Sequence, residues 1–128
     1  MHRNPLKAYQ TVNRTTMPGR ETEAAVLTKA ALKLKECQKN WDSENCESKL
    51  GEALKYNQLV WSIFQGELSK KENPLPTKLK IDLIRLSGFI DTRIVQIMAE
   101  KRPDPKKLNI IININQNIAA GLRGSPSD

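Results

Sequence analysis

Apolar residues recur at steps of three and four along most of this 128-residue chain, the spacing of one face of an α-helix. Three such stripes occupy residues 18–41, about 47–69 and about 76–101, with polar breaks at 40–45 and 70–76 between them. The stripes consist of Ala24, Leu27, Ala31, Leu34 and Trp41; Leu50, Leu54, Asn57, Trp61, Phe64 and Leu68; and Leu79, Leu83, Leu86, Ile90, Ile94 and Ile97. The pattern predicts three amphipathic helices joined by short connections.

The segment from Pro103 to Gly124 carries two conflicting signals. Its run of β-branched side chains, Ile110 to Ile112 and Ile114, favours a strand. Its boundaries favour a helix, because Asp104 can cap a helix, Pro105 suits the first helical position, and Gly121 or Gly124 can end one. The 18 residues from Pro105 to Leu122 are long for a strand. We therefore expect a fourth helix here, with Leu108, Ile111, Ile112, Ile118, Ala119 and Leu122 on its apolar face.

Four amphipathic segments with short connections predict an all-α fold, a small antiparallel bundle of about four main helices. The bundle domain is expected to span residues 18–124. A basic N-terminal arm, irregular or short-helical, would precede it at residues 1–17, and a flexible tail would follow at 125–128.

The net charge of +7 is concentrated near the start of the chain. Residues 1–20 contain no acidic group, and their four cations are the candidate contacts of a basic arm: Arg3, Lys7, Arg14 and Arg20. Such an arm could bind RNA, anionic lipid or an acidic protein, or it could be a solvated tail that keeps the protein soluble. The spacing of the four charges is sparser than in typical nucleic-acid-binding arms, which favours the solvated tail.

Compartment and metal chemistry are also constrained by the sequence. No segment has the roughly 20 apolar residues of a membrane span, and the N-terminus lacks the apolar region of a signal peptide, so a cytoplasmic protein is expected. In a reducing compartment Cys37 and Cys46 are expected as free thiols, although a short connection could also bring them together. The only histidine is His2, so neither a metal site nor a cofactor is expected.

Catalytic groups that could converge are scarce. The chain has no glycine-rich phosphate loop, and Asp82 and Asp91 are nine residues apart on one predicted helix, so they do not share a face. We therefore expect a protein without enzymatic activity.

Three polar residues interrupt the apolar stripes: Asn57, Arg93 and Asn115. A buried amide or guanidinium group needs hydrogen-bond partners, because an unpaired one costs about 1–3 kcal/mol. We expect these side chains to bond to one another or to nearby backbone and so to fix the register of the helices; the alternative is that they line a binding groove. Trp41 and Trp61 pose a similar choice between core packing, which is favoured, and a partly exposed binding anchor.

In their order along the chain, several short motifs together make the sequence resemble the FlaF family of flagellar biosynthesis regulators. Any one motif is weak, but the ordered set covers about residues 5–123 and is specific. The motifs are Ala8-Tyr9; Glu23-Ala24 with Leu27, Ala31, Leu34 and Trp41; Ala53 to Asn57; Leu59 to Trp61; Ile63-Phe64; Asn73 to Pro76; Ile90 and Arg93; Lys107 to Ile112; Asn115; and Ile118 to Leu122.

The resemblance implies a small, cytoplasmic, non-enzymatic protein that acts on flagellin production and export, in association with a second regulator of the FlbT type. The leading hypothesis is direct binding of flagellin, with a helix docked in a groove beside Val60, Ile63, Ile84 and Val95. The alternatives are binding of flagellin messenger RNA through the basic arm, or a scaffold role for other regulators. A homodimer is also conceivable, because a long helix with two apolar stripes can bury one of them against a second copy.

Overall fold

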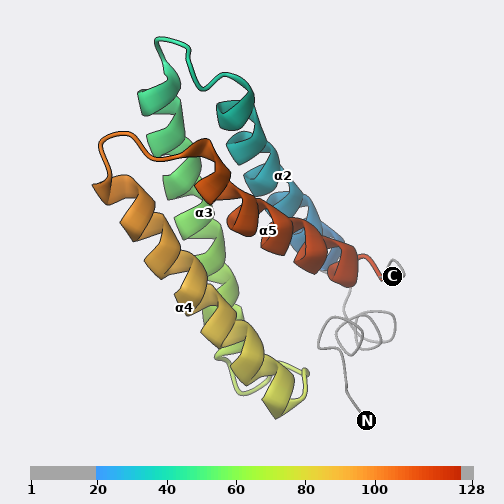
Figure 1. Ribbon diagram of the computed structural model, residues 1–128. Coiled ribbons are helices and arrows are strands. Elements are labelled where there is room, and N and C mark those ends of the chain that lie inside the picture. The colour runs from blue at the N-terminus through green and yellow to red at the C-terminus, as the bar shows by residue number, and fades with distance from the viewer. Residues whose placement is uncertain (1–19, 125–128) are drawn as a thin grey trace.

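The computed structural model describes residues 20–124, and these residues form helices with no strand among them. The helices run up and down in antiparallel order, as predicted (Figure 1). Their bounds are α2, Arg20–Lys39; α3, Cys46–Leu68; α4, Thr77–Ala99; a 3₁₀ turn η1, Pro105–Leu108; and α5, Asn109–Leu122.

Helix α3 is the centre of the bundle. It packs against α2 on one flank and α4 on the other, while α5 lies against α2 and crosses in front of α3 (Figure 1). Of the three other α-helices, α3 is the main neighbour of α4, whereas α2 has extensive contacts with both α3 and α5. The fold is therefore a three-helix unit of α2, α3 and α5, with α4 attached along one side.

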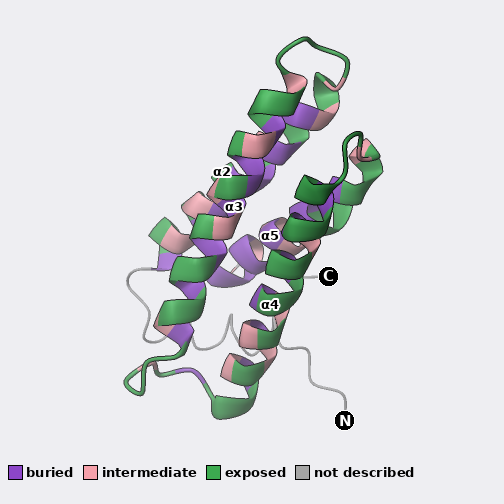
Figure 2. Cartoon of the chain, turned by 90° about the vertical axis from the view of Figure 1, so that its left-hand side faces the viewer, coloured by how far each residue is buried: buried purple, intermediate pink, exposed green. Residues whose placement is uncertain are grey.

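The core follows the apolar stripes predicted from the sequence. Buried positions face inward on every helix and exposed positions face out (Figure 2). Trp61, Ile90 and Ile111, from three different helices, are each at most 2% exposed. Trp61 also meets Phe64 in an edge-to-face contact with ring centroids 5.6 Å apart, a geometry that aromatic pairs prefer.

The isoleucine run is helical, which confirms the prediction for this segment, but the helix does not begin at Pro105 as expected. Residues Pro105–Leu108 form a 3₁₀ turn, and the α-helix starts at Asn109. Asp104 does cap this start, since its side chain accepts a hydrogen bond from Lys106 N at 2.9 Å. Gly121 is buried inside the helix, and the left-handed residue after its end is Gly124, with φ of 71°.

The connection between α3 and α4 contains the Asn-Pro-Leu-Pro motif. Asn73 donates from its side chain to the carbonyl oxygen of Glu67, and its Oδ1 accepts from Leu75 N. These two bonds fold the connection back on the end of α3, so that Leu75 is only 3% exposed and closes the lower end of the core. The proline-rich motif therefore has a structural role in this protein, because it closes one end of the core.

Candidate interaction surfaces

A hydrogen-bonded group of polar side chains lies inside the core and joins three helices. Asn115 on α5 donates to Asn57 Oδ1 on α3 at 2.6 Å, and its own Oδ1 accepts from Trp61 Nε1 at 2.7 Å. Asn57 donates in turn to the carbonyl oxygens of Ala30 on α2, at 3.1 Å, and Ala53 on α3, at 2.8 Å. Both amides are fully buried, so the group has no open surface to offer a ligand.

Arg93 does not belong to this group. It lies partly buried on α4, with its guanidinium 5.6 Å from the centroid of the Phe89 ring. Its Nε atom is buried and has no hydrogen-bond partner in the described part of the chain. The three polar residues singled out from the sequence therefore divide into a bonded pair, Asn57 and Asn115, and a separate surface arginine. Whether the pair fixes the helix register stays a prediction.

The four side chains predicted to bind a partner lie in different environments. Val60 is 8% exposed and belongs to the core, where it offers a partner almost no surface. Ile63 on α3 is 59% exposed and Val95 on α4 is 52% exposed, while Ile84 is partly buried against the core. The structure thus leaves Ile84 and Val95 together on one helix, and separates them from the buried Val60.

Helix α4 carries a second, mostly apolar stripe on the flank of its buried inner stripe. We call it the outer stripe: the positions 81, 84, 88, 91, 95 and 98, spaced by alternating steps of three and four, occupied by Ile81, Ile84, Gly88, Asp91, Val95 and Met98. Ile81 is 43% exposed and Met98 also 43%. A Cβ added at Gly88 would meet nothing within 4 Å. The outer stripe is partly covered, because Ile84 packs against the core and Asp91 Oδ1 accepts a hydrogen bond from Gln58 Nε2 of α3 at 3.2 Å, whereas the inner stripe of α4 is buried against α3.

Most of the candidate basic arm lies outside the residues that the structure describes. Arg3, Lys7 and Arg14 lie outside residues 20–124. Arg20 differs from the expectation of an arm contact: it is the first residue of α2, is only 5% exposed, and forms an ion pair with Glu23. Its guanidinium therefore belongs to the start of the bundle.

An open cleft of about 620 Å³ occupies the end of the bundle where α3 begins and α4 ends. We call it the end cleft. Its apolar lining includes Trp41, Leu54, Ile97 and Met98. Trp41 is half-buried here, whereas Trp61 is in the core, so the two tryptophans of the sequence have different environments. Spacing could not distinguish them, because the stripe that predicted Trp41 extends two residues past the end of α2.

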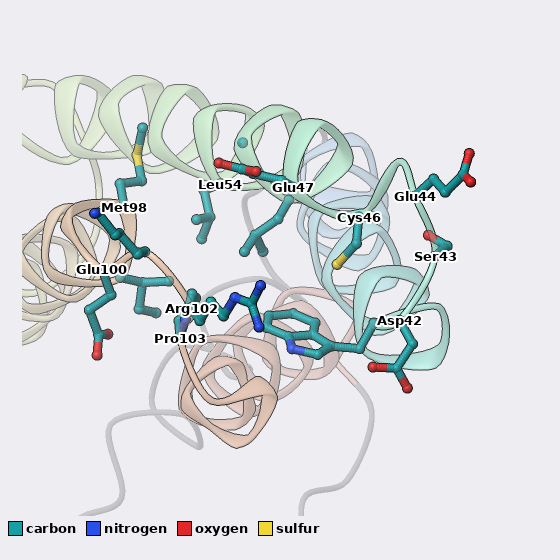
Figure 3. A pocket seen from close by; sticks show the side chains of 15 residues that line it. Asp42, Ser43, Glu44, Cys46, Glu47, Leu54, Met98, Glu100, Arg102 and Pro103 are labelled. Carbon is teal, nitrogen blue, oxygen red and sulfur yellow. The ribbon is translucent and has the colours of Figure 1, made fainter.

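Charged side chains line the rim of the end cleft. Asp42, Glu44 and Glu47 come from the α2–α3 connection and the first turn of α3, and Arg102 comes from the connection after α4 (Figure 3). In the figure Arg102 extends into the cleft, below Glu47, while Asp42 and Glu44 lie at the opposite end. The end cleft could not be predicted from the sequence, because its residues come from three separate connections and helix ends.

The two cysteines line a second hollow of about 280 Å³ beside the end cleft, between the end of α2 and the start of α3. Both are free thiols, and Cys37 is buried while Cys46 is half-buried. Burial raises the pKa of Cys37, and the nearby Cys46 raises it further. Burial, followed by the charges of Asp42 and Glu47, raises the pKa of Cys46. Both groups are therefore protonated, weakly nucleophilic thiols at neutral pH.

The described residues contain neither a metal-binding group nor a helix that could span a membrane. Within residues 20–124, no three side chains of His, Cys, Asp or Glu are grouped so that they could hold a metal ion. None of the helices described is long and apolar enough to cross a membrane. The outer stripe and the end cleft are the surfaces of this part of the chain that are considered below as places for a partner.

Comparison with known proteins agrees with the sequence motifs. The family model described as "Flagellar protein FlaF" matches residues 5–122, which include all of the described helices. No curated protein and no solved structure matches the chain. Because the match extends over nearly the whole sequence, the chain belongs to the FlaF family of flagellar proteins.

Proposed function

We propose that this FlaF protein is a non-enzymatic regulator of flagellum biogenesis that controls flagellin synthesis or secretion by binding flagellin as a chaperone-like partner. Membership of the FlaF family supports the flagellar role. The observation that carries the proposal of direct protein binding is the outer stripe of α4, on which the apolar side chains of Ile81, Val95 and Met98 are exposed.

The physical argument is helix-to-helix docking. An amphipathic helix from a partner can lay its own apolar stripe along a row of side chains spaced by three and four. Ile84 and Val95 lie on this row, three turns apart, and Gly88 between them allows a close approach because it has no side chain. Flagellin is the expected partner because its terminal segments become helical on assembly and expose apolar surface beforehand.

The test is isothermal titration calorimetry of the full chain with purified flagellin encoded alongside it. Val95→Asp places a charge on the outer stripe and should weaken binding about tenfold or more, since a buried unpaired carboxylate is costly. Gln96→Asp is the matched control, because Gln96 is an exposed neighbour about 100° away from Val95 around the same helix, outside the outer stripe. It should leave the affinity unchanged. Absence of any binding between wild-type protein and flagellin would reject the proposal.

Salt dependence separates this function from binding of flagellin messenger RNA. Contacts with phosphate release counterions, so RNA affinity falls steeply as salt rises, whereas contact through an apolar stripe is nearly indifferent to salt. A complex with flagellin whose affinity changes little with salt supports the proposal. Steeply salt-dependent binding of the messenger RNA, with none of flagellin, would replace it.

A further inference from the structure

The end cleft has an apolar floor between rims of opposite charge. We propose that it binds an amphipathic helix of a protein partner that carries basic side chains along one edge and acidic side chains along the other. This proposal depends on the proposed function in one respect only: that flagellin is the protein that supplies the helix. The chemistry of the cleft itself defines the helix that fits.

Met98 and Trp41 provide the apolar contact of the end cleft. Met98 is 43% exposed and Trp41 is half-buried, whereas Ile97 and Leu54, each 1% exposed, also line the cleft but offer a partner almost no surface. Methionine side chains adapt to different apolar partners because they are flexible and polarizable. Met98 is also the last position of the outer stripe, so the outer stripe and the end cleft adjoin at this side chain.

The rims provide charge complementarity. On the acidic rim, Asp42, Glu44 and Glu47 have no ion pair with any described residue. On the basic rim, Lys101 and Arg102 are likewise unpaired, because the neighbouring Glu100 is occupied by Lys107 at 2.5 Å. The unpaired charges are therefore available to a partner: cations would meet the acidic rim, and anions would meet the basic rim.

Opposite rims also fix the direction of the bound helix. Turning such a helix end over end exchanges its two edges, which brings like charges together on both sides of the cleft. A helix with two basic edges, or with two acidic edges, is repelled by one rim in either direction. The end cleft therefore selects for a helix with edges of opposite charge and binds it in a single orientation.

Three synthetic peptides test the proposal against the full chain. They share one apolar face and differ only in their edges, which are mixed, both basic or both acidic. Fluorescence anisotropy should show the mixed peptide binding about tenfold more tightly than either uniform peptide, with the difference shrinking as salt screens the rims. Equal affinity for all three peptides would overturn the proposal.

A charge-reversed variant gives the second arm of the test. Lys101→Glu with Arg102→Glu makes both rims acidic, so the preferred ligand should change from the mixed peptide to the all-basic one. Lys71→Glu with Lys78→Glu is the matched control, because it makes the same charge change at the other end of the bundle. If the rim variant keeps its preference for the mixed peptide, or if the control variant changes preference, the end cleft is not the binding site.

Flagellin titrated against the same variants separates the two proposals. If wild-type protein fails to bind flagellin, the proposed function is rejected, and the peptide preferences still decide the chemistry of the cleft. If flagellin binds and the rim reversal weakens it while the control does not, the helix in the cleft comes from flagellin. If flagellin binds equally to both variants while the peptides follow the predicted preferences, the cleft accepts a mixed-edge helix from another protein.

Discussion

Asn115 on α5 and Asn57 on α3 share a 2.6 Å hydrogen bond in the buried interior of the bundle. Asn115 Oδ1 also accepts a hydrogen bond from Trp61 Nε1, and the side-chain nitrogen of Asn57 also donates to the backbone of α2. Every helix of the three-helix unit therefore contributes an atom to one group of bonds. A sideways shift of any of these helices would leave a buried donor or acceptor without a partner, so we expect this group to favour a single alignment.

Replacing Asn115 with alanine should lower the free energy of unfolding by about 2–4 kcal/mol, since it leaves Trp61 Nε1 and Asn57 Oδ1 unpaired in the core. Urea denaturation measures this change. Asn117→Ala is the matched control, as Asn117 is an exposed asparagine on the same helix, and it should cost less than about 0.5 kcal/mol. Similar losses of unfolding free energy in the two variants would show that the buried amide contributes no more to stability than the exposed one.

Asp104 offers a second, smaller prediction at the start of the 3₁₀ turn. Asp104→Ala removes the acceptor for Lys106 N and should cost about 1 kcal/mol of stability, whereas Asp104→Ser should retain most of it. Thermal unfolding followed by circular dichroism checks both variants. If serine proves as costly as alanine, the hydrogen bond to Lys106 is not the source of the stabilisation.

Helix α4 should exchange its amide hydrogens faster than α5 does. Its contacts with α3 are less extensive than those of α5 with α2, and several of its apolar side chains are already exposed, so local opening exposes less apolar surface than opening of α5. Hydrogen exchange followed by mass spectrometry measures protection for each helix. Binding of a partner to the outer stripe should slow exchange in α4 selectively. Equal protection of α4 and α5 in the free protein would contradict this view.

Alkaline pH should destabilise the protein through Cys37. Because burial raises the pKa of this thiol above its ordinary value of 9.0, the folded state keeps the proton after the unfolded state has lost it. The stabilisation is complete below pH 9.0 and is lost as pH rises through the folded pKa. The free energy of unfolding should therefore fall between neutral pH and about pH 10, and fall less in Cys37→Val. Identical pH profiles for the two proteins would exclude the effect.

The helices could be predicted from the sequence because period and boundary signals agree along most of the chain. The one local conflict, at Ile110 to Ile114, was decided by length and by Asp104 and Pro105, and the structure confirms the helix. The 3₁₀ turn could not be predicted, because proline and a capping aspartate suit the start of either kind of helix. Its geometry depends on Gln38 of α2, which donates to Pro105 O and to Asn109 Oδ1.

The binding surfaces were harder to predict, since periodicity does not say which flank of a helix is covered. Val60 and Ile63 are three residues apart on one helix, yet the first is in the core and the second is exposed. What separates them is the position of α2, a long-range property that local spacing does not contain. The end cleft was missed for a related reason: its rims come from Asp42 and Arg102, which are distant in the sequence and meet only in the folded chain.

The pairing of α2 with α5 has a consequence for the speed of folding. Arg123 bonds to Glu21 across a sequence separation of 102 residues and to Thr28 across 95. Helical bundles usually fold quickly because most of their contacts are local, and rates fall as the mean separation of contacting residues grows. In this protein the apolar face of α2 stays uncovered until α5, at the other end of the described chain, packs against it. Leu27 and Leu34 are therefore exposed to solvent until that step. A flagellar protein of this shape would therefore fold more slowly than other bundles of its size, and would be most prone to aggregation before α5 docks.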